Sequence, residues 1–284
     1  MKIIILGANG LIGYNILTAF LENPNFDVLA FVRDKKKFNS FGPDLLKKII
    51  SDFSIYNLPD LEKTILNLNP DVVVNCLGIT KHRISEFSIE EVIYTNALFP
   101  HYLLSICEKQ NIRCIQISTD CVFQGTKGNY SEEDTSDALD LYGKTKSLGE
   151  LLTGNSLTLR ISTIGFELDT KYGLLEWFLS QEEECYGYSK AYFTGLPCKF
   201  FAKILADLLT NHKQLKGLYH IASEPIDKFS LLNLIKDTFK INVNIKENDI
   251  FMIDRTLDAK KFNSATSFVS PKWLNLVKTL KEFD

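Results

Sequence analysis

The sequence predicts an α/β fold in which helices cover both faces of a doubly wound parallel sheet. Two observations lead to this prediction. Continuous apolar runs alternate with stretches of helical periodicity through the first half of the 284-residue chain, which is typical of strands buried on both faces of a parallel sheet. A glycine-punctuated segment also joins the first apolar run directly to the first helical stretch.

The expected strands are short runs rich in aliphatic and β-branched residues: Lys2–Leu6, Asp27–Val32, Asp71–Cys76, Ile112–Ser118 and Leu157–Ile161. The expected helices among them have apolar residues at helical spacing: Leu11–Leu21, Ile89–Lys109 and Leu141–Thr153. The second half is less regular, with expected helices over Phe200–Thr210, Phe229–Phe239 and Pro271–Phe283 and a strand over Gly217–Ile221. No repeat or linker is visible, so we expect a second unit that packs against the first.

The composition indicates an ordinary globular protein. Hydrophobic residues make up 45% and charged residues 24% of the chain, which is too apolar for a disordered protein. The net charge of -3 lacks the basic excess typical of nucleic-acid-binding proteins. The first apolar run, Ile3 to Leu6, is far shorter than the roughly 18 residues of a membrane-spanning helix and has no signal-cleavage pattern. We therefore expect neither a nucleic-acid nor a membrane partner.

The six cysteines are scattered without a C-x-x-C pair, and the four histidines show no H-E-x-x-H spacing. Without a secretory signal, this pattern predicts free thiols in a reducing, cytoplasmic compartment and gives no support for a metal site.

The glycine segment has the spacing G-x-x-G-x-x-G and lies between the first strand and the first helix. In dinucleotide-binding turns, one glycine allows the tight turn, a second lets the backbone approach the pyrophosphate, and a third lets helix and strand pack closely. The pyrophosphate then lies at the free N–H groups of the helix N-terminus. The residues expected to bind the cofactor here are Gly7, Asn9, Gly10, Leu11, Ile12 and Gly13.

The end of the second strand carries the signal for cofactor choice. An arginine there accommodates the 2′-phosphate of NADP, whereas an acidic residue binds the ribose hydroxyl of NAD. Arg33 favours NADPH, and Asp34 leaves NADH open. Three lysines follow, which we interpret as a solvated loop. Asp52 and Phe53 are expected to end a third strand near the adenine.

Tyr142 and Lys146 lie four residues apart on an expected helix and therefore share one face. A tyrosine titrates near pH 10, and a nearby ammonium group lowers that pKa toward the range of an acid–base catalyst. Ser118 and Thr119, at the end of the preceding strand, supply hydroxyls that could orient a substrate oxygen. The same Y-x-x-x-K spacing recurs at Tyr186, but without a helical pattern, and we interpret that copy as chance.

These motifs, taken together, resemble the extended short-chain dehydrogenase/reductases and, more narrowly, the dTDP-4-dehydrorhamnose reductase family. The matching blocks are GANGLIG (7–13), DVVVNCLGIT (71–80), TNA (95–97), ISTDCVFQG (117–125), LYGKTKSLGE (141–150), LTLRIST (157–163), FTG (193–195) and GLYHIAS (217–223). The resemblance covers almost the whole chain. It implies a Rossmann-type cofactor domain (1–160 plus about 195–224) and a smaller α+β sugar-nucleotide region (161–194 plus 225–284).

The resemblance also implies residue roles. Tyr142 would donate the proton, Lys146 would bind the nicotinamide ribose, and Thr119 would hydrogen-bond the sugar oxygen. Residues expected to line the cofactor cleft are Ser118, Cys76, Leu77 and Gly78, and those expected near the substrate are Thr119, Asp120, Cys121, Thr163 and Arg255. A homodimer is common in this family.

Two departures concern the sugar pocket. Cys121 stands where the family usually has tyrosine, and Thr163 stands where it usually has tryptophan. Aromatic faces suit apolar sugar surfaces, so smaller residues indicate a different sugar or a bulkier substituent. Alternatively, Tyr192, Phe193 or Trp177 fills the space.

The sequence thus predicts an NADPH-dependent reductase of the C4 ketone of a nucleotide-linked 4-keto-6-deoxy sugar, in the biosynthesis of surface-polysaccharide sugars. One alternative is an epimerase or dehydratase that retains its NAD, although Cys121 rather than a glutamate follows Asp120. Another is a non-catalytic, NADP-binding regulatory subunit. The basic run Lys81 to Arg83 could meet a substrate phosphate, but we interpret it as a solvated loop.

Overall fold

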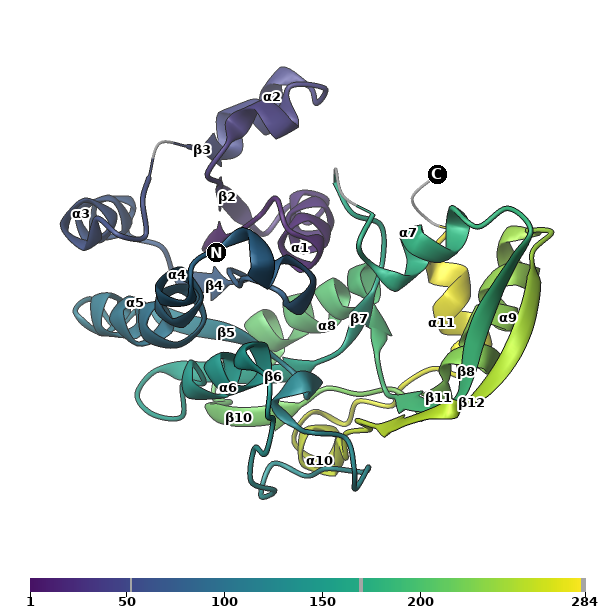
Figure 1. Ribbon diagram of the computed structural model, residues 1–284. Coiled ribbons are helices and arrows are strands. Elements are labelled where there is room, and N and C mark those ends of the chain that lie inside the picture. Colours follow the sequence, from purple (N-terminus) through teal and green to yellow (C-terminus); the bar gives the residue numbers. More distant parts are fainter. Residues whose placement is uncertain (52, 169–170, 282–284) are drawn as a thin grey trace.

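The computed structural model describes residues 1–51, 53–168 and 171–281 of the chain. A seven-stranded sheet forms its centre, with the strand order β10-β6-β5-β4-β1-β2-β3 (Figure 1). Every neighbouring pair in this sheet is parallel. The expected doubly wound α/β fold is therefore confirmed. Its strands are β1 Lys2–Leu6, β2 Asp27–Phe31, β3 Ile49–Ile50, β4 Val72–Asn75, β5 Arg113–Thr119, β6 Ser156–Ile161 and β10 Gly217–His220.

The strands bury alternate residues on opposite faces of the sheet. On β1, Ile3 and Ile5 belong to one hydrophobic core, together with residues of the helices α1 Leu11–Leu21 and α8 Cys198–Asn211. Ile4 and Leu6 belong to a second core, together with α3 Leu58–Leu68 and α5 Phe99–Glu108. Burial on both faces explains why these strands are continuous apolar runs in the sequence.

The long helix expected over Ile89–Lys109 is interrupted. It consists of α4 Ile89–Ile93, a π-helical turn Tyr94–Leu98, and α5. A π turn inserts a residue into the helical ladder and is frequent at functional sites. Periodicity alone does not reveal it, because the apolar spacing continues on both sides.

The expected helix Leu141–Thr153 is also shorter than predicted, since α6 covers Leu141–Leu148 and Gly149 caps it. A Cβ atom on Gly149 would lie 2.0 Å from the carbonyl oxygen of Asn96 in the π turn. The helix therefore ends where the backbone passes close to the neighbouring helical segment.

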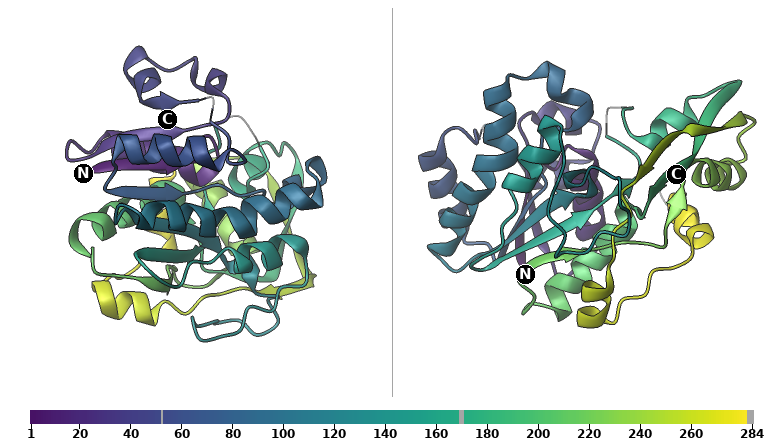
Figure 2. Two further views of the ribbon diagram at one scale, coloured as in Figure 1. Left: turned by 90° about the vertical axis from the view of Figure 1, so that its left-hand side faces the viewer. Right: turned by 60° about the horizontal axis from the view of Figure 1, so that its bottom comes forward.

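A second, three-stranded sheet was not predicted. It has the order β11-β8-β12 and consists of β8 Glu184–Phe193, β11 Ile226–Asp227 and β12 Asn244–Asp254. Figures 1 and 2 show the long strands β8 and β12 side by side, extending away from the central sheet. Tyr186 and Lys190 lie on β8, so the second Y-x-x-x-K spacing is not on a helix.

The remaining elements are the helices α2 Pro43–Lys48, α7 Leu174–Leu179, α9 Lys228–Phe239, α10 Lys260–Thr266 and α11 Trp273–Thr279, the strand pair β7 Thr163–Ile164 and β9 Leu196–Pro197, and the 3-10 turns Lys35–Phe38, Lys81–Glu86 and Asp120–Val122. Core residues of α8, α9 and α11 belong to the same cluster as those of β1. The division into a cofactor domain and a substrate region stays a prediction.

None of the helices in the described part of the chain is long and apolar enough to cross a membrane.

Replacing Gly13 by alanine is expected to destabilise the fold. An added Cβ atom would lie 2.3 Å from the carbonyl oxygen of Gly7, which is backbone and cannot easily move. We expect the free energy of unfolding, measured by urea denaturation, to fall by about 1–3 kcal/mol. Gly42→Ala is the control, because nothing lies within 4 Å of its added Cβ atom, and a change of about 1 kcal/mol or less is expected there. Equal losses in both variants would contradict the close-approach argument.

Candidate active site

The glycine turn lies at the carboxyl edge of the central sheet, beside the point where the strand order reverses. β1 pairs with β2 on one side and β4 on the other, and ligands of such sheets bind in the crevice at this switch point. Gly7 has a φ of 76°, and an added Cβ atom there would lie 3.0 Å from the side chain of Leu77. The segment Cys76 to Gly78 therefore lies directly against the glycine turn, so both segments border the predicted cofactor cleft.

The N-terminus of α1 is available to an anion. Its N-cap is Gly10, which has no side chain and provides no capping hydrogen bond to the first turn. No capping side chain therefore accepts a hydrogen bond from the first N–H groups of the helix. The helix dipole also favours negative charge at this position. These features fit the pyrophosphate of a dinucleotide.

Lys146 lies on α6 with its ammonium group inside the protein. The side chain is 5% exposed, and its Nζ donates a 2.7 Å hydrogen bond to the carbonyl oxygen of Ile117 on β5. Burial lowers the pKa of Lys146 to about 8, against the opposing effects of Glu150 and Cys76. A Cβ atom added to Gly78 would lie 3.8 Å from this Nζ, so the lysine adjoins the cleft wall formed by Cys76 to Gly78.

Asn96, in the π turn, fixes that wall. Its side-chain oxygen accepts a 2.8 Å hydrogen bond from the backbone N–H of Ile79, and its amide donates to the Ile79 carbonyl at 3.0 Å. The same amide donates to Thr145 on α6 at 3.3 Å. The π turn thus connects the loop after β4 to the helix that carries the Tyr–Lys pair. Asn96 belongs to the TNA block (95–97), but no spacing in the sequence indicated that it would connect this loop to α6.

Tyr142 and Thr119 lie together, as predicted, and a hydrogen bond between their side chains lowers the pKa of the phenol. Burial is the larger effect, however, and with Cys121 and the Asp120 and Asp140 carboxylates it raises the pKa of Tyr142 above its ordinary value. The expected lowering by Lys146 is therefore wrong for this structure. The physical reason is that the phenol is removed from water, while the Lys146 ammonium is bound to the Ile117 carbonyl.

The predicted substrate residues form a group around the end of β5. Thr119 caps the turn Asp120–Val122 by accepting a hydrogen bond from the N–H of Cys121 at 3.1 Å. Arg255 reaches this turn from the end of β12, with its Nε donating to the Phe123 carbonyl at 2.9 Å and a terminal nitrogen 3.6 Å from the Cys121 sulfur. Burial raises the pKa of Asp120 despite the nearby Arg255 and Lys228.

Thr163 occupies a different part of the site. It lies on β7, which pairs with β9, and its hydroxyl forms a hydrogen bond with the thiol of Cys198. Of the aromatic side chains expected as replacements, Phe193 is 4% exposed, whereas Tyr192 and Trp177 are 40% and 37% exposed.

Ser118, predicted to adjoin the cofactor, donates a 2.6 Å hydrogen bond to the Glu150 carboxylate. Glu150 forms a buried, two-pronged ion pair with Arg160 on β6, in which both N···O distances are 2.7 Å. Glu150 lies two residues after the end of α6, so no helical spacing indicated its role. Bidentate pairs of this kind fix geometry as well as charge.

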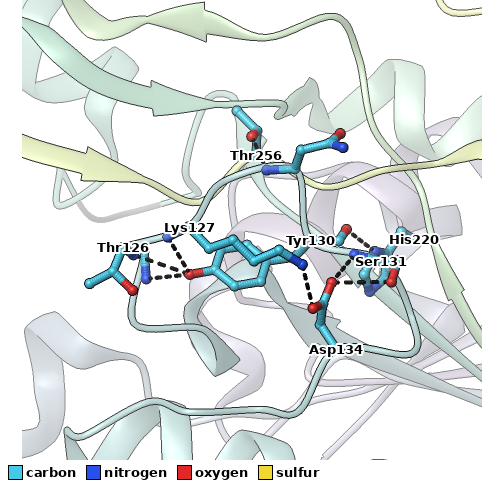
Figure 3. A network of polar contacts seen from close by, with 9 residues as sticks. Thr126, Lys127, Tyr130, Ser131, Asp134, His220 and Thr256 are labelled. Atoms are coloured by element: carbon cyan, nitrogen blue, oxygen red, sulfur yellow. Dashed lines mark hydrogen bonds and ion pairs between the residues drawn. The ribbon is translucent and has the colours of Figure 1, made fainter.

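The network continues into the loop after the Thr119 turn. Arg160 donates to Nε2 of His220 at 3.2 Å, and Nδ1 of His220 lies 3.1 Å from the carbonyl oxygen of Tyr130. Figure 3 shows the Tyr130 hydroxyl accepting hydrogen bonds from three successive backbone N–H groups, those of Gly125, Thr126 and Lys127. The loop from Gly125 to Tyr130, which follows the Thr119 turn, is therefore held by hydrogen bonds within itself and by its contact with His220.

The residues predicted to choose the cofactor lie at the same sheet edge. Arg33 is exposed, and its guanidinium has no hydrogen-bond or ion-pair partner within the described ranges. The Asp34 carboxylate, in contrast, caps the turn Lys35–Phe38 by accepting from the N–H of Lys36 at 2.9 Å. Phe53 packs against Phe31 of β2, with ring centres 5.0 Å apart, and Asp52 lies outside the described residues.

In the basic run from Lys81 to Arg83, which we interpreted as a solvated loop, Lys81 pairs with Asp140 at 3.1 Å, and Arg83 pairs with Glu86 at 2.7 Å.

The parallel sheet, the glycine turn at its switch point and the Tyr–Lys helix define the class of this protein: an extended short-chain dehydrogenase/reductase. Within that class, the chain belongs to the family described as the RmlD substrate binding domain, whose model matches residues 1–279.

Two curated relatives are informative. A dTDP-4-dehydrorhamnose reductase of Aggregatibacter actinomycetemcomitans is 24% identical over 234 residues, which cover 79% of this chain and 74% of the relative. The β subunit of methionine adenosyltransferase 2 from Xenopus laevis is 26% identical over 266 residues, which cover 84% of this chain and 72% of the relative.

Among solved structures, a dTDP-4-dehydrorhamnose reductase of Bacillus anthracis in complex with NADP superposes with a TM-score of 0.82 at 20% identity. The match covers all of this chain and 99% of that one. This similarity shows that the two proteins share a fold.

The buried His220 predicts a pH dependence of stability. Burial and the Arg160 charge lower its pKa from 6.5 to about 3. The unfolded chain takes up this proton near pH 6.5 whereas the folded chain does not until about pH 3. The free energy of unfolding should therefore fall by up to about 1.4 kcal/mol per pH unit through this window as the pH falls.

The difference between wild type and His220→Asn, measured by urea denaturation from pH 7 to pH 4, isolates this contribution. The variant should lose stability less steeply than the wild type as the pH falls. His101→Asn, at an exposed position, should follow the wild-type slope. Equal slopes for all three proteins would show that His220 is not held neutral.

Proposed function

We propose that this protein is an NADPH-dependent reductase of the C4 ketone of a nucleotide-linked 4-keto-6-deoxy sugar, and that it serves the biosynthesis of surface-polysaccharide sugars. The observation that carries this proposal is the pairing of the Tyr142 phenol with the Thr119 hydroxyl at the end of β5, next to the cleft wall that Lys146 adjoins. The Thr119 hydroxyl donates to the Asp120 carboxylate at 3.2 Å. A carbonyl oxygen bound here would therefore accept a hydrogen bond from Tyr142, and one from Thr119 once that hydroxyl turns away from Asp120.

The reaction balances with the groups available. NADPH, when bound, would be the source of the hydride that the carbonyl carbon accepts, and NADP⁺ would remain. Tyr142 donates the phenolic proton to the oxygen, and Thr119 stabilises the negative charge that develops there. A raised pKa keeps Tyr142 protonated before the reaction, as a proton donor requires. The site would recover its proton from solvent after the alcohol leaves.

The contacts at the end of β2 support NADPH over NADH. The Asp34 carboxylate is engaged in capping its own turn, which leaves it poorly placed to bind a ribose hydroxyl. Arg33 is exposed and available to the 2′-phosphate. Lys146 would bind the nicotinamide ribose with the protons that remain after its bond to Ile117. A homodimer stays a prediction of the family resemblance.

Tyr142→Phe tests the proton donor. With an enzymatically generated nucleotide 4-keto sugar, NADPH oxidation followed at 340 nm should slow by about 100-fold to 10,000-fold, because general acid catalysis contributes on that scale. Binding of NADPH, followed by fluorescence, should be retained. Tyr102→Phe is the control, since Tyr102 is an exposed tyrosine of α5, and its turnover should equal that of the wild type. Unchanged turnover in Tyr142→Phe would refute the proposed mechanism.

The chain is also similar to a methionine adenosyltransferase subunit. The alternative to the proposed reductase is therefore a non-catalytic, NADP-binding regulatory subunit. The Tyr–Lys–Thr arrangement argues against a purely binding role, because such a role does not require a buried proton donor beside a bound hydroxyl. Wild-type protein that binds NADPH but oxidises it with none of a panel of nucleotide 4-keto sugars would favour the regulatory alternative. Turnover without net consumption of NADPH would favour the epimerase alternative.

A further inference from the structure

The chain from Gly125 to Tyr130, the 125–130 loop, pairs with the residues on both sides of Arg255. Before the arginine, the N–H of Asp254 donates a 2.8 Å hydrogen bond to the carbonyl oxygen of Gly125. After the arginine, the carbonyl oxygen of Thr256 accepts a 2.8 Å hydrogen bond from the N–H of Tyr130. Figure 3 shows Thr256 beside this loop. Arg255 therefore lies between two residues that the loop binds.

The backbone of the 125–130 loop also lies against the arginine side chain. A Cβ atom added to Gly125 would lie 2.9 Å from Cγ of Arg255. One added to Gly128 would lie 2.2 Å from the carboxylate of Asp254. Neither position has room for a side chain, so the loop is in direct contact with the stem of Arg255. A change in the conformation of the loop would therefore displace the guanidinium group.

The hydroxyl of Tyr130 fixes that conformation. It accepts hydrogen bonds from three successive backbone N–H groups, those of Gly125 at 3.2 Å, Thr126 at 3.1 Å and Lys127 at 3.1 Å (Figure 3). The Tyr130 side chain is buried, and its ring stacks on Phe123 with the ring centres 4.1 Å apart. An N–H group that loses its acceptor inside a protein is costly, so this one oxygen stabilises the present course of the loop.

Arg255 reaches from this loop toward the reacting end of the site. Its Nε donates a 2.9 Å hydrogen bond to the carbonyl oxygen of Phe123, the residue on which the Tyr130 ring stacks. A terminal nitrogen of Arg255 lies 3.6 Å from the sulfur of Cys121. The N–H of Cys121 in turn donates to the Thr119 hydroxyl at 3.1 Å. The loop thus determines where the guanidinium lies relative to Thr119.

We propose that Tyr130 is a positioning residue of the active site. Its hydroxyl fixes the 125–130 loop, and the loop holds the Arg255 guanidinium at the end of β5, beside the place of the substrate carbonyl. The part of this inference that concerns the substrate rests on the proposed function. Tyr130 acts through Arg255 rather than on the substrate, because its hydroxyl already accepts three hydrogen bonds from the loop.

The first test measures the position of Arg255 without any substrate. The Nε–H of Arg255 gives a cross-peak in the ¹H–¹⁵N NMR spectrum, which Arg255→Gln identifies by its absence. Tyr130→Phe keeps the aromatic ring and removes the oxygen that the loop N–H groups bind. The Nε–H proton should then exchange with water about tenfold faster, since the loss of a hydrogen-bond acceptor changes a local opening equilibrium on that scale. Unchanged exchange would overturn the inference.

A second variant and a control separate positioning from general destabilisation. Thr256→Val removes the hydroxyl that accepts a 2.7 Å hydrogen bond from the N–H of Asn129. It loosens the same loop from the other side, so it should also speed the exchange. Tyr219→Phe is the matched control, because Tyr219 is a half-buried tyrosine of β10 that packs against Phe262. Equal acceleration in Tyr219→Phe would contradict a positioning role.

The second test asks whether Tyr130 acts through Arg255 during turnover. With a nucleotide 4-keto sugar, Tyr130→Phe should raise KM about tenfold, while kcat and the affinity for NADPH stay within about twofold of the wild type. In an Arg255→Gln background, the same substitution should change KM by less than about twofold, because residues in one chain of contacts are not additive. Tenfold effects in both backgrounds would refute the link to Arg255.

The two tests also separate this inference from the proposed function. The NMR measurement needs no substrate, so it decides whether Tyr130 positions Arg255 even if the protein reduces none of the sugars. Faster Nε–H exchange in Tyr130→Phe without reductase activity in the wild type would support the positioning and refute the reaction.

Discussion

The burial of the Lys146 ammonium group is the constraint on which the site depends. A charged amine inside a protein needs a compensating partner, and Lys146 finds one in the Ile117 carbonyl at 2.7 Å. This bond joins α6 to β5, and it thereby sets the position of Tyr142 one turn earlier on the helix. The carboxylate of Glu150, just beyond the end of α6, favours the charged form of the lysine.

The surrounding polar network supports this arrangement. Glu150 is held by Arg160 and Ser118, and Arg160 continues to His220. On the other side, Asn96 connects α6 to the loop that borders the glycine turn. A helix placed by buried hydrogen bonds on both sides is rigid, and rigid placement is what a site needs when its catalysis depends on alignment.

Local signals predicted much of the fold and the main site. The glycine turn and the Tyr142–Lys146 spacing each involve residues within a few positions, so the sequence shows them directly. The small sheet was missed because β8 and β12 pair across some distance in the chain. The pKa of Tyr142 was mispredicted because burial, which depends on the whole fold, raises it.

The most direct measurement of the central claim is a crystal structure of the protein with NADP⁺ bound. The account predicts that the nicotinamide ring lies in the cleft between the glycine turn and α6. Lys146 should contact its ribose, and the Tyr142 hydroxyl should face carbon 4 of the ring across a space the size of one carbonyl group. A cofactor that binds elsewhere, or a Tyr142 hydroxyl that points away from the ring, would contradict it.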